Sequence, residues 1–122
     1  MNKTLLNEYM KNLKDNLDDG LIATSLCNQE DGIAIAEYNS SLDATLAYND
    51  IVNYTIKKFR DHNVPNINKY MIFNLENDKT LIIIPLDIYR WTILVDDNKI
   101  KLGVLLKIVI PQVREKFKSV LL

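Results

Sequence analysis

Residues 21–38 read LIATSLCNQEDGIAIAEY, and they carry the first of two hairpin signals that bracket a long helical stretch. Leu21–Cys27 and Ile33–Tyr38 are rich in apolar and β-branched residues, and the polar turn Asn28–Gly32 separates them. An acidic residue followed by Gly between two such runs is among the strongest short-range signals for a β-hairpin. The segment therefore predicts two adjacent antiparallel strands.

A second group of strands is predicted in the C-terminal half of the chain. Two short polar breaks, Asn77–Lys79 and Asp87–Tyr89, separate runs of apolar and β-branched residues. Breaks this short join antiparallel strands. The three predicted strands are Tyr70–Leu75, Leu81–Leu86 and Trp91–Val95.

Two helices are predicted before the second group of strands. Apolar residues recur at three- and four-residue spacing from Thr4 to Leu17, and Gly20 predicts the end of this helix because Gly adopts the left-handed conformation without strain. Asp43–His62 contains no Gly or Pro and predicts a long middle helix, which begins at a capping side chain within Ser40–Asp43.

The last helix is predicted from about Ile100 to near the C-terminus. Pro111 lies inside it and predicts a kink or two separate helical pieces, because Pro removes a helical hydrogen bond. One apolar stripe should face the sheet, and three apolar residues off that stripe should pack beside the N-terminal helix. The stripe is Leu102, Leu106, Val109, Val113, Phe117 and Val120, with Ile110 beside it, and the three residues are Val104, Leu105 and Ile108.

The predicted order is α-β-β-α-β-β-β-α, an α+β fold in a single domain of residues 1–122 with a five-stranded antiparallel sheet and helices on both faces. The chain has 48% apolar and 25% charged residues, as expected for a globular domain. Fifteen basic and sixteen acidic side chains give a net charge of −1, which attracts neither nucleic acid nor anionic lipid. The apolar run Leu81–Leu86 is too short to insert into a membrane, and the single Cys27 fits a reducing compartment. We therefore expect a cytoplasmic protein.

Apolar residues on the middle helix cover more of its circumference than one sheet can use. They form two adjacent sectors that together span roughly half of the circumference, whereas a helix on one sheet needs a stripe of about 100°. We expect the sheet to cover the first sector and a second protein surface to cover the other; alternatively, Ile51 and Tyr54 merely border the core. The first sector is Tyr48, Val52, Ile56 and Phe59, and the second is Ala44, Ala47, Ile51 and Tyr54.

The sequence offers little chemistry. His62 lies among basic residues without a second His or Cys, so a role at the helix C-terminus is favoured over a catalytic or phosphate-binding role. Cys27 has no His to activate it and is expected to be a small buried apolar residue, and Trp91 is expected in the core. Asp18-Asp19 and Asp96-Asp97 are expected in turns. No Gly-rich phosphate loop is present, so we expect no enzyme activity, cofactor or metal.

Three stretches resemble the roadblock/dynein light chain domain. The hairpin turn Glu30–Ile35 is similar to the turn of that family, in which an acidic residue and Gly precede a small or apolar strand. Leu81–Ile84 closes on Pro85, and Tyr89 opens the next strand, which is similar to the family's connection between its fourth and fifth strands. Lys99–Gly103 resembles the entry to its last helix. Together the three stretches extend the resemblance over essentially the whole chain.

This resemblance implies a sheet with the middle helix on one face and the terminal helices on the other. It also implies a homodimer formed by the middle helix and the third strand. Members of the family regulate or scaffold small Ras-like GTPases, or serve as dynein light chains. On this basis the dimer interface would comprise Ala44, Ala47, Ile51, Tyr54, Tyr70, Ile72 and Asn74.

Two other classes of protein remain open. A dimeric secretion-chaperone-like protein-binding module has a similar size and layout but would have three strands before the middle helix. A profilin-like ligand sensor would need an internal pocket beneath Trp91.

Overall fold

The computed structural model describes residues 1–121, so only the last residue of the predicted domain lies outside it. Its elements follow the predicted order, with bounds that differ by one or two residues at most ends. They are α1 (Lys3–Leu17), β1 (Leu21–Asn28), β2 (Ala34–Tyr38), α2 (Leu42–Asp61), β3 (Met71–Leu75), β4 (Lys79–Leu86), β5 (Tyr89–Asp96), α3 (Leu102–Val104) and α4 (Ile110–Leu121).

The five strands form one antiparallel sheet in the order β2-β1-β5-β4-β3, which makes β2 and β3 the edge strands. β2 ends at Tyr38 and α2 begins at Leu42, so two strands precede the middle helix. The predicted topology is confirmed. The three strands that would favour a secretion-chaperone layout are not formed in this part of the chain.

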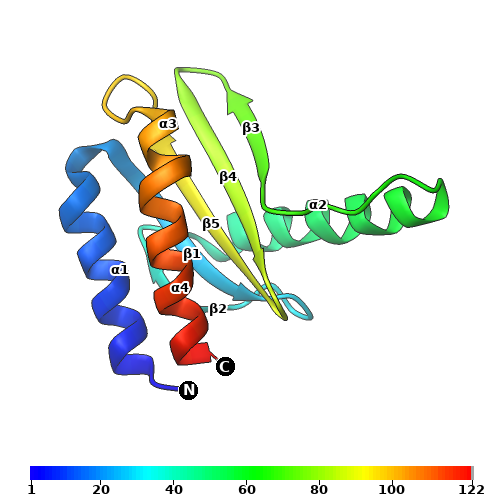
Figure 1. Cartoon of the computed structure of the whole chain (residues 1–122), viewed down its shortest axis with the longest axis horizontal. Helices are drawn as coiled ribbons and strands as arrows, with labels where there is room; N and C mark the ends of the chain where they lie inside the picture. Colours follow the sequence, from blue (N-terminus) through cyan, green and yellow to red (C-terminus); the bar gives the residue numbers. More distant parts are fainter. Residues whose placement is uncertain (122) are drawn as a thin grey trace.

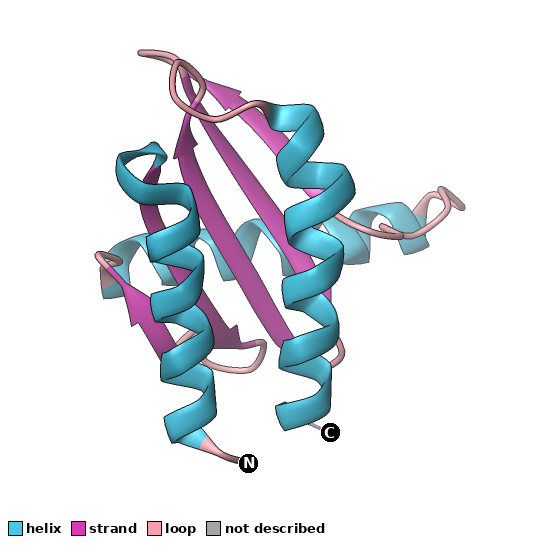
Figure 2. Cartoon of the chain, turned by 60° about the vertical axis from the view of Figure 1, so that its left-hand side comes forward, coloured by secondary structure: helices cyan, strands magenta, loops and turns pink. Residues whose placement is uncertain are grey.

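The sheet has helices on both faces (Figures 1 and 2). α1 and α4 lie side by side on one face, and α2 crosses the other. The larger core lies under α1 and α4, where Trp91 is fully buried. Its indole nitrogen donates a hydrogen bond to Thr24 Oγ1 at 3.0 Å, and its ring meets the Phe117 ring edge-on at 5.0 Å between centroids. Trp91 is therefore a core residue, as predicted, and Phe117 packs where a profilin-like pocket would need space.

The end of α1 differs from the prediction for Gly20. The left-handed residue is Asp18, with φ of 51°, and a 3-10 turn then runs from Asp18 to Gly20. Gly20 is buried, and a Cβ atom there would overlap the side chain of Ile100. Glycine is thus required at this position for close packing rather than for a left-handed backbone.

The last helix accommodates Pro111 through a π-helical turn at Leu105–Val109, which links α3 to α4. The amide of Ile110 donates to the carbonyl of Leu105, five residues earlier. A π turn holds an extra residue, so it changes which residues face the sheet. Leu105 is buried in the core that contains Leu6, Met10 and Leu13 of α1, as predicted, whereas Val104 and Ile108 remain 47% and 53% exposed, contrary to the prediction that α1 would cover them.

In residues 1–121, no helix combines the length and apolar character required to cross a bilayer.

Candidate interaction surface

α2 begins and ends at residues that favour those positions. Ser41 Oγ accepts a hydrogen bond from the Ala44 amide at 3.2 Å, which satisfies one free N–H of the first turn. Lys58 and Arg60 lie in the last turn, where positive charge interacts favourably with the helix dipole. The C-terminal half of α2 extends past the edge strand β3 (Figures 1 and 2). α2 is therefore a formed helix that the sheet supports along only part of its length.

The middle of α2 contacts β5 and the turn after β1 through polar groups, which sequence periodicity did not predict. Asn49 is buried, and its Nδ2 donates to the Gln29 carbonyl at 2.8 Å. Asn53 Nδ2 donates to the same carbonyl at 3.3 Å. Arg90 of β5 donates from Nη2 to Asn53 Oδ1 at 3.3 Å. The two asparagines are four residues apart and therefore lie on one side of the helix. This spacing is the sequence feature from which the polar contact could have been predicted.

Arg90 is an unusual residue for this position because it is only 5% exposed. Burial lowers the pKa of its guanidinium below the ordinary value. Its Nη1 donates to the carbonyls of Asp87 and Tyr89, at 3.5 and 3.4 Å. Within the described residues it forms no ion pair, so neutral oxygens alone stabilise its charge. Only the Asn53 oxygen comes from α2, so a displacement of the helix would remove this acceptor from a buried charge.

The apolar contact of α2 with the sheet centres on Val52. This side chain is fully buried against Leu81 and Ile83, and Tyr48 and Ile56 pack around the cluster. Partial burial raises the pKa of the Tyr48 phenol. The first predicted sector thus covers the sheet, with Phe59 half-buried near the helix end.

The second predicted sector faces away from the sheet. Ala44 is half-buried and Ala47 is exposed, while Ile51 and Tyr54 are 40% and 65% exposed. Lys58 Nζ lies 5.6 Å from the centre of the Tyr54 ring, which leaves the rest of that ring accessible. Among the described residues, therefore, Ala47, Ile51 and Tyr54 of this sector stay largely exposed.

The β3 residues of the predicted interface do not lie on the same face as that sector. Side chains alternate along a strand, so Met71 and Phe73 face α2 and pack against its cluster. Ile72 pairs with Ile82, which belongs to the core under α1 and α4, and Asn74 shares that face. Tyr70, just before β3, also packs on the α1/α4 core. The structure therefore brings Met71 and Phe73, which the sequence prediction omitted, to the face that carries α2.

The residues with potential chemistry lie apart from one another. Cys27 is a free, buried cysteine, and burial raises the pKa of its thiol. His62 is exposed at the end of α2. Among residues 1–121 no group of three or more His, Cys, Asp or Glu side chains is arranged to hold a metal ion. The candidate functional site is therefore the exposed side of α2 next to the edge strand β3.

Solved structures of roadblock-type proteins share this fold. Myxococcus xanthus MglB matches with a TM-score of 0.82 and 11% identity, over 98% of this chain and 89% of that chain. The gliding protein MglB from Thermus thermophilus matches with a TM-score of 0.75 and 11% identity, over 96% and 88%. A Roadblock/LC7 domain from Streptomyces avermitilis matches with a TM-score of 0.70 and 10% identity, over 94% and 96%. The chain has the roadblock/LC7 fold, as the sequence resemblance predicted.

The sequence itself matches no protein-family model and no curated protein. Profilin II from Acanthamoeba castellanii shares the fold less closely, with a TM-score of 0.59 and 9% identity over 93% of this chain and 96% of that one. Structural similarity at such low sequence identity establishes the fold alone.

Proposed function

We propose that this chain is a homodimeric, non-catalytic interaction domain that binds a small Ras-like GTPase in the cytoplasm. The observation that supports it best is the exposed sector of α2 beside the open edge of β3. Ile51 and Tyr54 are exposed apolar side chains on that sector, and Phe73 of β3 is half-buried on the same face.

The edge strand favours assembly with a second copy. β3 pairs with β4 on one side only, so its other edge presents unpaired backbone groups. Such an edge readily pairs with another strand. Antiparallel pairing of two β3 strands would join the sheets and bring the two α2 helices together, because α2 extends past this edge.

The GTPase proposal rests on the sequence resemblance and on the shared fold. The roadblock-type likeness implies regulation or scaffolding of Ras-like GTPases, and the structures with this fold include MglB, a gliding protein. Since the sequence carries no phosphate-binding loop, the dimer would act by preferring one conformation of its partner.

Isothermal titration calorimetry with a cognate Ras-like GTPase tests the proposal. The GTPase is loaded with GDP or with a non-hydrolysable GTP analogue, and the affinities should differ between the two states. Nucleotide is also titrated into the isolated chain, which should not bind it. Equal affinity in both states would reduce the role to scaffolding, and micromolar binding of nucleotide by the chain alone would contradict the proposal.

A further inference from the structure

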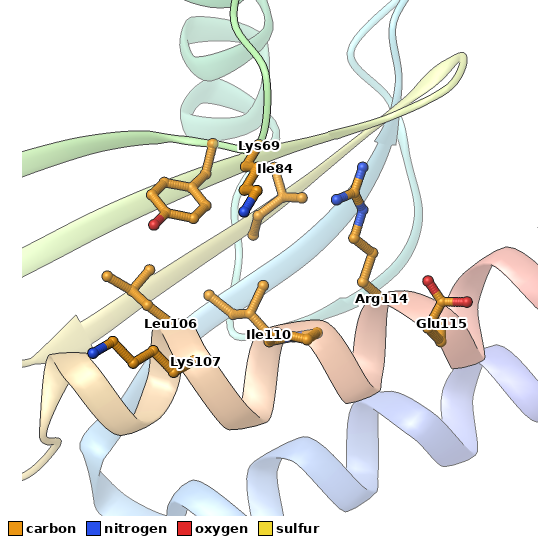
Figure 3. Close-up of a pocket in the computed structure, with 9 residues that line it drawn as sticks. Lys69, Ile84, Leu106, Lys107, Ile110, Arg114 and Glu115 are labelled. Carbon is orange, nitrogen blue, oxygen red and sulfur yellow. The ribbon is translucent and has the colours of Figure 1, made fainter.

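A second surface lies on the opposite face of the sheet from α2, between α4 and the start of β3 (Figure 3). It is a cavity of about 520 Å³. The floor is apolar, and basic side chains surround it. We call it the basic groove, formed by Lys69, Lys107 and Arg114 above Ile84, Leu106 and Ile110.

The groove is open because two helices cannot cover five strands. A helix is about 10 Å wide and strands are about 4.8 Å apart, so each helix covers roughly two strands. In Figure 1, β3 lies at the edge of the sheet away from α1 and α4. Ile72, in the middle of β3, faces this side and is 41% exposed. An apolar strip therefore continues from the groove along β3.

The charges around the groove are not neutralised within the described part of the chain. Lys69, Lys107 and Arg114 form no ion pair there. The carboxylate on the rim, Glu115, pairs with Lys118 at 3.8 Å. Arg114 Nε is buried and has no hydrogen-bond partner among these residues. Since the whole chain has a net charge of −1, this positive charge is a local feature.

The positions of the basic residues indicate the shape of an acidic ligand. In Figure 3, Lys107 and Arg114 lie at opposite ends of the groove, with Lys69 across from the helix between them. Seven residues separate Lys107 from Arg114, which corresponds to about 10 Å along a helix. Ile110 lies midway, on the floor. A neighbouring helix with acidic residues seven apart and apolar residues between them has the same spacing.

We propose that the basic groove binds an amphipathic helix of a protein partner that carries acidic side chains at positions i and i+7 and apolar ones at i+3 and i+4. Its carboxylates pair with Lys107 and Arg114, and its apolar side chains cover the accessible parts of Leu106 and Ile72. Arg114 presents a planar guanidinium that can bind a carboxylate through two parallel hydrogen bonds. This surface is separate from α2, so the proposal does not depend on the proposed dimer or on the GTPase.

The test uses two labelled peptides of about 20 residues, a length that supports a helix. One has Glu at i and i+7 and Leu at i+3 and i+4 in an Ala/Gln background, and the other has Lys in place of Glu. Fluorescence anisotropy measures their binding to the full chain. The Glu peptide should bind saturably, and at least about tenfold more tightly than the Lys peptide.

Variants locate the binding site. Replacing Lys107→Gln and Arg114→Gln together should weaken the Glu peptide at least about tenfold. Lys116→Gln is the matched control, because Lys116 Nζ lies 5.7 Å from the ring of Tyr9 on α1 and so faces away from the groove. It should leave the affinity unchanged. Arg114→Lys keeps the charge and provides a second, milder variant, which should bind more weakly than the unmodified chain because it loses the two-pronged hydrogen bond.

Three results would overturn the proposal. The first is equal affinity for the Glu and Lys peptides or no saturable binding of either. The second is full affinity in the doubly substituted variant. The third is a shift of the Arg114 side-chain NMR signal on addition of inorganic phosphate but not on addition of the Glu peptide. This result would identify a site for a small anion instead.

Discussion

Arg90 and Asn53 connect β5 to α2: Arg90 Nη2 donates to Asn53 Oδ1 at 3.3 Å, and Asn53 in turn donates to the Gln29 carbonyl. The same carbonyl accepts from Asn49. β5, α2 and the turn after β1 thus meet through one polar network, beside the apolar contact of α2 at Val52. This network determines where α2 lies on the sheet, and through α2 it positions the proposed interface.

Asn53→Ala should lower the free energy of unfolding by about 1–3 kcal/mol, because it removes an acceptor from a buried guanidinium. Asn12→Ala on α1 is the control, since it makes the same exchange at an exposed helix position and should leave stability unchanged or slightly higher. Urea denaturation followed by circular dichroism measures both. If Asn53→Ala is as stable as Asn12→Ala, the network does not hold α2.

Ile51→Asp should dissociate the proposed dimer, at a cost of several kcal/mol if the new charge stays unpaired in the interface. Ile108→Asp makes the same substitution at a similarly exposed residue on the last helix and should remain dimeric. Light scattering coupled to size-exclusion chromatography gives the mass of each. A monomeric unmodified chain, or a dimeric and folded Ile51→Asp variant, contradicts the proposed interface.

Phe73→Thr should weaken the dimer at least about tenfold, whereas Ile72→Thr should change it by less than about threefold. The two residues are neighbours on β3, but Phe73 faces α2 and Ile72 faces the core under α1 and α4. Analytical ultracentrifugation over a range of concentrations measures the dissociation constants. A larger effect at Ile72 would favour the set of residues first predicted from the sequence.

Stability should decrease at alkaline pH because of Cys27. Burial raises the pKa of this thiol, so the folded chain keeps the proton above about pH 8.5, where the unfolded chain loses it. Because the thiol has a higher pKa in the folded chain, it contributes stability that is complete below the pKa of the unfolded chain. This stability is lost as the pH rises toward the pKa of the folded chain. The loss should reach at most about 1.4 kcal/mol per pH unit.

Cys27→Ala removes this contribution while other groups titrate as before. The difference in unfolding free energy between the unmodified chain and Cys27→Ala should be constant from pH 6 to about pH 8. It should become smaller between about pH 8.5 and 10. A constant difference over the whole range would show that ionisation of the thiol is not linked to folding.

The sequence by itself determined the helices and strands and their order. Hairpin turns and helical periodicity depend on residues close together in the chain, so residues 21–38 and Asp43–His62 could be interpreted without tertiary information. The exposed sector of α2 was also visible from angular spacing alone. Trp91 and Cys27 were correctly placed in the interior because of their residue types.

Only the tertiary structure decided which surfaces these elements share. The face occupied by Phe73 or Ile72 depends on the register of β3 against β4, and one residue of shift would exchange them. Gly20 is required because of Ile100, which lies eighty positions later in the chain and reaches it only in the folded state. The basic groove likewise combines Lys69 with Arg114, whose proximity follows from the packing of α4 on the sheet. Contacts between distant segments depend on how layers pack, and local sequence patterns carry no information about that packing.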